Sequence, residues 1–248
     1  GPQGVINYTP LTNCAPMQVQ FTSTAVNTQS YVWDFSDGIT KITNNSFTTH
    51  TYSGPGRYVP RVILEDGKGC RIPILGLDTI VVNDTPTIVA GPHPIVCLGQ
   101  SATLNASGAV SYTWDAHPTL SCTNCPNPIV SPVGRTIYRV SGIDANGCQG
   151  SDTVLMRVML PGSLTVAAGD TICVGEAVQL KAAGFDRYTW SPTTGLNNPT
   201  IANPVARPIA TTNYQIVATD TLNCFSATMT VPVVVYPIPT FDIVESVI

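Results

Sequence analysis

Apolar and polar residues alternate one by one in short stretches along the chain. In "TIYRVSGI" (136–143), Tyr138, Val140 and Gly142 fall on one face of an extended strand, and "SDTVLMRVML" (151–160) follows after a turn. An apolar period of two residues predicts strands with one buried face. No stretch keeps the 3.6-residue apolar period of a helix, and Pro, Gly and Asn separate the stretches. The pattern predicts an all-β fold built from antiparallel β-sandwiches of the Ig-like kind.

The chain also repeats itself. Residues 97–148 match residues 173–224 without a gap, including a Tyr-Thr-Trp triplet, an Asn-Pro pair and a cysteine at each end. The first third follows the same plan more loosely, around Tyr31-Val32-Trp33. We therefore predict three tandem modules of about 75–80 residues each. Their expected bounds are 3–84, 85–160 and 161–238, and 239–248 is expected to be the start of a further module or a linker.

Prolines mark the ends of these modules. The stretches 81–91, 157–169 and 233–243 each contain a terminal strand, a prolyl joint and a new strand. Because proline stiffens a linker, we expect an elongated array of semi-rigid modules rather than loosely hinged ones. The third joint resembles the start of a fourth module, so we expect the chain to be a piece of a longer array.

Composition and charge narrow the function classes. Only 10% of the residues are charged, against about 25% in ordinary globular proteins. The formal net charge of −4 gives no basic footprint for nucleic acid. The longest apolar stretch, 231–236, contains Pro232 and is far shorter than the roughly 20 residues of a membrane span. We expect neither nucleic acid nor a membrane span in this segment.

Eight cysteines are the strongest compositional signal. Cys97 and Cys148 are as far apart in sequence as Cys173 and Cys224, and Cys14 and Cys70 are nearly so. Matched spacing in a β-rich chain predicts disulfides and an extracytoplasmic compartment. Each long bridge would clip the entry segment of a module to its final hairpin. The predicted pairs are Cys14–Cys70, Cys97–Cys148, Cys122–Cys125 and Cys173–Cys224.

The C-x-x-C pair has one alternative reading. Cys122 and Cys125 have half the spacing of a zinc site, but the second C-x-x-C of such a site is missing. A disulfide that staples a loop is therefore favoured over a metal site. The third module has Asn198 and Ile201 at these positions, so the pair belongs to the second module alone.

The stretch "YVWDFSDG" (31–38) places two carboxylates, Asp34 and Asp37, close together. Such a pair could act as an acid–base couple or bind calcium. The pair has no counterpart in the other modules, where Trp114 is followed by Asp115-Ala116-His117 and Trp190 by Ser191-Pro192-Thr193, and the D-x-[DN]-x-[DN]-G loop is absent. A structural turn role, in which the side chains accept hydrogen bonds from backbone N–H groups, is favoured. Calcium at Asp34 and Asp37 stays the alternative, and we expect no other cofactor.

Catalysis by a nucleophile needs a Ser or Cys beside a histidine base. His50, His93 and His117 fall in different strands or loops, and repeat symmetry accounts for the long-range cysteines. We therefore expect a protein that is not an enzyme and has no catalytic residues.

The tryptophans Trp33, Trp114 and Trp190 recur at one position of the repeat, alternating with polar residues. This pattern favours core residues over a carbohydrate-stacking platform. Other aromatic candidates for an exposed surface are scattered: Tyr8, Phe47 and Phe185.

The first module resembles a PKD domain. "YVWDFSDG" followed by "HTYSGPGRYVPRVILEDGKGC" (50–70) matches the W-D-F-G-D-G and H-x-Y-x-x-P-G-x-Y patterns of that family. Ser36 replaces the usual glycine, and Pro60 interrupts the expected alternation. The likeness covers residues 5–83 and implies a PKD-like β-sandwich. The matching residues are Trp33, Asp34, Phe35, Asp37, Gly38, His50, Tyr52, Pro55, Gly56 and Tyr58.

The second and third modules, with "SCTNCPNP" and "ICVGEAVQLKAAGFDRYTWSPTTGLNNP", resemble Ig-like repeats of surface and gliding-associated adhesins of Bacteroidetes. Those proteins leave the cell by type IX secretion, so the resemblance implies a secreted, cell-surface, adhesive protein. Asp-Thr-aliphatic triplets also resemble the O-glycosylation acceptor motif of exported proteins in that phylum, although strand alternation alone would produce them. The acceptors would be Thr79, Thr153, Thr171 and Thr221.

Two functions follow from these resemblances. The first is a non-catalytic stalk segment of a large bacterial adhesin or surface filament. The alternative is an accessory glycan-binding region of a secreted polysaccharide-degrading enzyme, since PKD modules occur in both settings. The expected partners are neighbouring modules of the same chain, surface glycans and other cell-surface proteins. Assembly of copies through exposed sheet edges is a third possibility.

Overall fold

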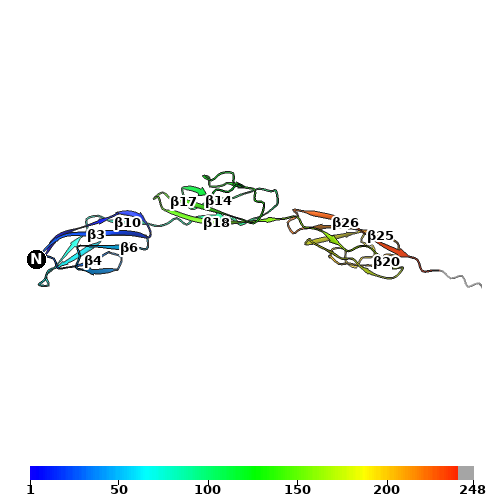
Figure 1. Cartoon of the computed structure of the whole chain (residues 1–248), viewed down its shortest axis with the longest axis horizontal. Helices are drawn as coiled ribbons and strands as arrows, with labels where there is room; N and C mark the ends of the chain where they lie inside the picture. Colours follow the sequence, from blue (N-terminus) through cyan, green and yellow to red (C-terminus); the bar gives the residue numbers. More distant parts are fainter. Residues whose placement is uncertain (240–248) are drawn as a thin grey trace, which may run out of the picture. The chain divides into compact units, whose positions relative to one another are not determined.

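The computed structural model describes residues 1–239, and all of the regular secondary structure in this range is β-strand (Figure 1). The all-β prediction is confirmed. The predicted segment 239–248 lies outside the described residues from residue 240 onward. Residues 1–239 contain no helix, and therefore none that is long and apolar enough to cross a membrane.

The first third of the chain forms three sheets, with strand orders β1-β3-β6, β2-β10-β7 and β5-β4-β8-β9. Most neighbours are antiparallel, but β2 runs parallel to β10. The strands are β1 (Gln3–Thr9), β2 (Thr12–Cys14), β3 (Met17–Val26), β4 (Ser30–Asp34), β5 (Thr40–Thr43), β6 (Phe47–Tyr52), β7 (Gly56–Tyr58), β8 (Arg61–Glu65), β9 (Arg71–Leu75) and β10 (Ile80–Asn83).

The middle third has sheets with orders β11-β14, β12-β18-β17-β15 and β13-β16. Here β12 runs parallel to the last strand, β18, as β2 does to β10. The strands are β11 (Val89–Gly91), β12 (Ile95–Cys97), β13 (Ala102–Thr103), β14 (Asn105–Ser107), β15 (Ser111–Trp114), β16 (Ile129–Val130), β17 (Thr136–Ile143) and β18 (Gln149–Met159).

The last third repeats the middle third strand for strand, with orders β19-β22, β20-β26-β25-β23 and β21-β24. The register repeats too: Trp114 lies opposite Val140, and Trp190 lies opposite Ile216. The strands are β19 (Thr165–Val166), β20 (Asp170–Cys173), β21 (Val178–Gln179), β22 (Ala182–Ala183), β23 (Arg187–Ser191), β24 (Val205–Ala206), β25 (Thr212–Thr219) and β26 (Ser226–Tyr236).

No described sheet mixes strands from two thirds of the chain. By compactness, however, the chain divides into two units, and the division passes through the middle third. One unit consists of Gly1–His93, Ala102–Val130 and Ile137–Leu155, and the other contains the remaining described residues. The three-module division stays a prediction, and we use first, second and third module as names for 3–84, 85–160 and 161–238.

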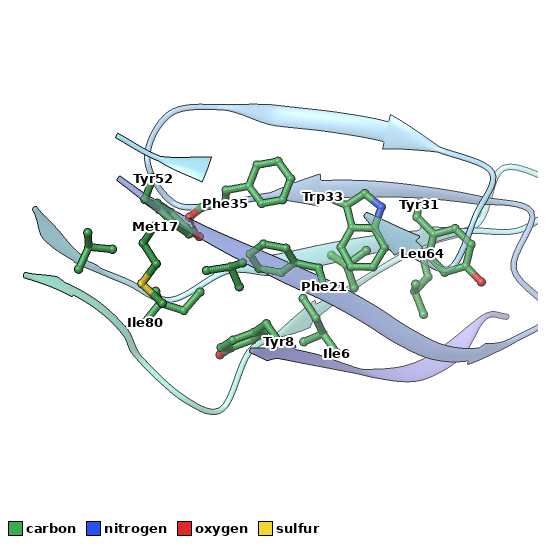
Figure 2. Close-up of a cluster of buried hydrophobic side chains, with 13 residues drawn as sticks. Ile6, Tyr8, Met17, Phe21, Tyr31, Trp33, Phe35, Tyr52, Leu64 and Ile80 are labelled. Atoms are coloured by element: carbon green, nitrogen blue, oxygen red, sulfur yellow. Dashed lines mark hydrogen bonds between the residues drawn. The ribbon is translucent and has the colours of Figure 1, made fainter. Parts of the chain in front are cut away.

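Each tryptophan is a core residue, as the repeat predicts. Trp33 and Trp190 are 0% exposed and Trp114 is 1% exposed. Figure 2 shows Trp33 among the buried aromatic side chains of the first module, between Phe21 and Tyr31. The rings of Tyr31 and Trp33 stack, with their centroids 5.8 Å apart. The tryptophans are therefore not available as a carbohydrate-stacking surface.

Candidate functional site

The acidic turn of the first module follows β4, the strand that carries Trp33. Asp34 Oδ1 accepts a hydrogen bond from the Ser36 backbone N–H at 3.0 Å. Asp37 Oδ1 accepts one from the Ile39 N–H at 3.1 Å. Ser36, at the usual glycine position of the PKD pattern, has a φ of 67° in the left-handed region. The two aspartates thus shape this turn.

The second oxygen of each carboxylate meets a basic side chain. Arg61 Nε donates to Asp34 Oδ2 at 2.9 Å, and His50 Nε2 lies 2.6 Å from Asp37 Oδ2. The His50 ring stacks on Phe35, with centroids 4.0 Å apart. Both carboxylates are therefore engaged by the chain itself. Within residues 1–239, no group of three or more His, Cys, Asp or Glu side chains is arranged to hold a metal ion.

The other two histidines have separate local roles. His93 Nδ1 accepts a hydrogen bond from the Leu155 backbone N–H at 2.9 Å. His117 Nδ1 lies 2.8 Å from Thr119 Oγ1, whose hydroxyl also contacts the Tyr138 hydroxyl. None of these contacts is with a serine or cysteine side chain, so the described histidines form no Ser–His or Cys–His pair.

The cysteine pairing differs from the prediction. Cys14 is bonded to Cys148 and Cys97 to Cys224, at sequence separations of 134 and 127 residues. The predicted pairs Cys14–Cys70, Cys97–Cys148 and Cys173–Cys224 are therefore wrong. Cys122 is bonded to Cys125, as expected. Cys70 and Cys173 are free and exposed.

Strand geometry explains why the predicted long pairs do not form. Cys173 lies in register with Tyr236, the last residue of β26, whereas Cys224 precedes the first residue of that strand. β26 has 11 residues, and a strand rises about 3.3 Å per residue, so roughly 35 Å separate the two cysteines. A disulfide needs Cα atoms within about 7 Å of each other. The pair Cys173–Cys224 would have to span the whole strand.

The same hydrogen bond fixes the first cysteine of every module, which we call the entry cysteine: Cys14, Cys97 and Cys173. The backbone N–H that follows each entry cysteine donates to the carbonyl of its last-strand partner, at 2.9, 3.0 and 3.0 Å. Those carbonyls belong to Asn83, Met159 and Tyr236, which pair in register with the entry cysteines. Every entry cysteine therefore lies at the C-terminal end of its module.

A shared turn fixes the second cysteine, which we call the turn cysteine: Cys70, Cys148 and Cys224. In each module an aspartate four residues earlier accepts the N–H of the turn cysteine, at 2.9, 2.8 and 3.1 Å. The residue before the turn cysteine has a positive φ, 84° at Gly69, 83° at Gly147 and 57° at Asn223. Asparagine is one of the few residues other than glycine that enters this region readily.

The turns at Asp66 and Asp220 change the acidity of these two aspartates. Hydrogen bonds from the N–H groups of Cys70 and Lys68 hold the pKa of Asp66 below its ordinary value of 3.8. Burial of Asp220 raises its pKa, but hydrogen bonds from the N–H groups of Cys224, Phe225 and Leu222 outweigh this effect and lower it. The turn aspartates are thus structural residues, as the sequence predicts for aspartates at turns.

The short disulfide supports the tryptophan of its module. Trp114 Nε1 donates to the Cys125 carbonyl at 2.9 Å, and Trp190 Nε1 donates to the equivalent carbonyl of Ile201 at 3.0 Å. In the third module, where the cysteines are missing, Asn198 Oδ1 accepts from the N–H and the hydroxyl of Thr200, both at 2.9 Å. A covalent bond and an asparagine turn hold the same loop.

The threonines of the Asp-Thr-aliphatic triplets lie mostly on the surface. Thr153, Thr171 and Thr221 are exposed and Thr79 is half-buried, whereas Ile80, Val154 and Ile172 are buried. This is the alternation of ordinary strands, so glycosylation stays a prediction. Of the aromatic candidates for a surface, Tyr8 is buried in the core and was wrongly expected to be exposed. Phe47 is exposed.

The fold and the cysteines define a class of protein: β-sandwich modules in tandem, joined by disulfides between modules and formed in an oxidising compartment. The sequence pattern of the PKD domain family matches residues 5–73, which confirms the resemblance of the first module. No curated protein matches the chain.

Several solved structures align with the chain at low sequence identity. The three N-terminal domains of the highly immunogenic outer capsid protein of bacteriophage RB49 share 10% identity and a TM-score of 0.45, covering 96% of this chain and 100% of that one. Drosophila N-cadherin EC1-4 shares 12% identity and a TM-score of 0.37, over 96% and 76%. DIP-gamma IG1+IG2 shares 12% identity and a TM-score of 0.40, over 61% and 98%.

Proposed function

We propose that this chain is a non-catalytic stalk segment of a secreted, cell-surface bacterial protein, either an adhesin or a surface filament. One observation carries the proposal: a disulfide joins the C-terminal end of each of the first two modules to a turn of the next module. A bond within a module would stabilise that module alone. A bond between modules gives each joint a second covalent connection, which is useful when the chain bears tension.

The two bonds overlap in sequence, and this overlap changes the path of a pulling force. In the reduced chain, about 210 residues separate Cys14 from Cys224. With both bonds closed, the shortest covalent path runs from Cys14 to Cys148, back along the chain to Cys97, and across to Cys224. This path contains only about 51 residues between cysteines, so the fully stretched protein is shorter by roughly 50 nm.

Single-molecule extension between the two termini tests the proposal. The variant with C70S and C173S is used, because it keeps the bonded cysteines and removes the free ones. We expect the oxidised protein to extend by roughly 50 nm less than the reduced protein at full unfolding. Equal lengths in both states would contradict the proposal, because the joints would then carry no second covalent connection.

A glycan array on the same variant separates the stalk from the competing prediction of an accessory glycan-binding region. The described tryptophans are all buried, so they offer no stacking platform for a sugar ring. We expect no binding above background across plant and bacterial polysaccharides. Reproducible binding of one glycan class would favour the accessory-region function instead.

A further inference from the structure

Cys70 and Cys173 are unbonded, yet each occupies a position at which the other modules form a disulfide. Cys173 is an entry cysteine, and both other entry cysteines are bonded to the turn cysteine of the following module. Cys70 is a turn cysteine, and both other turn cysteines are bonded to the entry cysteine of the preceding module. One of the two free thiols therefore belongs to an entry cysteine and the other to a turn cysteine.

Cys173 is held in the geometry of its bonded equivalents. Cys97 pairs in register with the last residue of β18, and Cys173 pairs with the last residue of β26. The N–H of the next residue donates to that partner's carbonyl at 3.0 Å in both cases. The N–H three residues after each cysteine donates back to its carbonyl, at 2.9 Å from Gln100 and 3.0 Å from Glu176.

Cys70 is likewise held as its bonded equivalents are. Asp66 accepts the N–H groups of Cys70 and Lys68, both at 2.9 Å. Asp144 accepts the N–H groups of Cys148 and Asn146, at 2.8 and 2.9 Å. Cys70 differs in exposure: it is exposed, whereas Cys148 in its disulfide is buried. The turn that holds Cys70 thus has the same hydrogen bonds as the turn that holds Cys148 in its disulfide. Only the partner sulfur is missing.

We propose that Cys173 forms a disulfide with the turn cysteine of another module of this repeat type, and that Cys70 forms one with an entry cysteine of such a module. This inference rests on the proposed function in one respect, since the partner is a further module of the same stalk. The bonds then continue the series Cys14–Cys148 and Cys97–Cys224 at both ends. Pairing is complementary, entry with turn, and never like with like.

The bond forms by thiol–disulfide exchange with a small disulfide such as oxidised glutathione. One protein thiolate attacks the glutathione disulfide, which gives a mixed disulfide and releases one glutathione thiolate. The second protein thiolate attacks the protein sulfur of the mixed disulfide and releases the second glutathione. The two cysteines lose two protons and two electrons in total, and the glutathione disulfide takes up both electrons as it becomes two thiols.

The first experiment tests complementarity between separate copies. The C70S variant retains Cys173, and the C173S variant retains Cys70. Each is oxidised alone and in an equal mixture, in a buffer of reduced and oxidised glutathione, and dimers are assigned by non-reducing peptide mapping. We expect the mixed dimer, bonded from Cys173 to Cys70, to exceed clearly the half share that random pairing gives.

The second experiment tests a neighbouring module in one chain. Two copies of the chain are fused end to end, so that Cys173 of the first copy precedes Cys70 of the second. We expect an intrachain disulfide between them whose yield does not depend on dilution, and its loss when either cysteine is replaced by serine. Peptide mapping of Cys14–Cys148 and Cys97–Cys224 in the same samples shows that each variant has folded.

The outcomes identify the source of the partner. A bond in the fused chain together with random pairing of separate copies assigns the partner to the same polypeptide. Preferential mixed dimers without the fused bond assign it to a second molecule, and both results together allow either source. Free thiols in the fused chain combined with random pairing overturn the proposal. The extension measurement above uses a variant without Cys70 and Cys173, so its result is independent of this one.

Discussion

Cys97 is bonded to Cys224, 127 residues further along the chain, although Cys148 occupies the equivalent turn of its own module. Cys148 is bonded instead to Cys14, an entry cysteine of the first module. Residues 97–148 are therefore enclosed by both disulfide loops. Two modules share each bond, so the loss of one bond affects a pair of modules rather than one.

We expect the replacement of Cys97 and Cys224 by serine to lower the free energy of unfolding of the oxidised protein by about 5 kcal/mol in the chain-entropy description of a loop this long. Denaturation with guanidinium, followed by tryptophan fluorescence, measures this change. The matched control replaces the free pair, Cys70 and Cys173, and should leave the free energy of unfolding of the monomer nearly unchanged. An equal loss in both variants would show that the bond itself contributes nothing.

The strands and the buried tryptophans could be predicted from the sequence because both depend on a local pattern. Alternation places Trp114 and Trp190 on the inner face of a strand, and the gapless repeat carries the register from one module to the next. The cysteine pairs could not be predicted in this way. Any two cysteines of a repeat recur at equal spacing, so equal spacing cannot separate bonds within a module from bonds between modules.

The direction of the strand that contains the entry cysteine decides which pairs can form. β20 runs parallel to β26, which carries Cys173 to the exit of its module, away from Cys224. Parallel pairing between this strand and the last strand of the module is a long-range feature with no local sequence signal. The partners of the acidic turn were missed for a similar reason: Arg61 and His50 are 27 and 13 residues from the aspartates that they contact.

The short disulfide should stabilise the second module by less than the long ones. Replacing Cys122 and Cys125 by serine releases a loop of only a few residues, for which the chain-entropy description gives about 2 kcal/mol. The loop carries the carbonyl that accepts from Trp114 Nε1, so the fluorescence of the folded protein should also change. An almost unchanged free energy of unfolding together with unchanged fluorescence would contradict a supporting role for this bond.

The pair Asp37–His50 should contribute more than the pair Asp34–Arg61. The side chains of His50 and Asp37 are 10% and 16% exposed, whereas that of Arg61 is 55% exposed. We expect D37N to lower the free energy of unfolding by about 1–3 kcal/mol, because it leaves a buried polar group without its partner. The matched variant D34N should lose no more than about 1 kcal/mol. Equal losses in thermal or chemical denaturation would contradict this ranking.

The calcium alternative can be tested on the same protein. Because Arg61 and His50 already engage the two carboxylates, we expect the melting temperature to be the same in excess calcium chloride and in EDTA. A rise with calcium that D37N abolishes would restore the calcium reading of this turn. A rise that persists in both aspartate variants would place the ion elsewhere on the protein.

Glycosylation of the Asp-Thr-aliphatic triplets depends on access to the threonine hydroxyl. Thr153, Thr171 and Thr221 are exposed, so we expect protein isolated from its own cells to carry glycan at these three before Thr79, which is half-buried. Intact-mass measurement followed by peptide mapping identifies the sites. A mass equal to that of the bare polypeptide would leave strand alternation as the whole explanation of the triplets.

The turn aspartates should make the stability of the protein depend on pH in acid. Folding lowers the pKa of Asp66 and of Asp220 below the ordinary value of 3.8, because backbone N–H groups stabilise the ionised carboxylates. At a pH above 3.8 the carboxylates are ionised in both states, and their contribution to the stability of the fold is complete. At a pH below 3.8 the unfolded chain binds protons that the folded protein does not, which favours unfolding. Their contribution disappears as the pH falls through the lower, folded values.

We therefore expect the free energy of unfolding to decrease as the pH is lowered below about 4. When Asp66 and Asp220 are both replaced by asparagine, which does not titrate, the free energy of unfolding should decrease less steeply with falling pH. The change in slope corresponds to the uptake of up to one proton fewer for each site. Urea denaturation at a series of acidic pH values measures both slopes. T221A alters an exposed residue of the third-module turn but keeps its carboxylate, so it should retain the steep slope. If the double variant lost stability in acid as steeply as the parent, the hydrogen bonds of these turns would not be the source of the pH dependence.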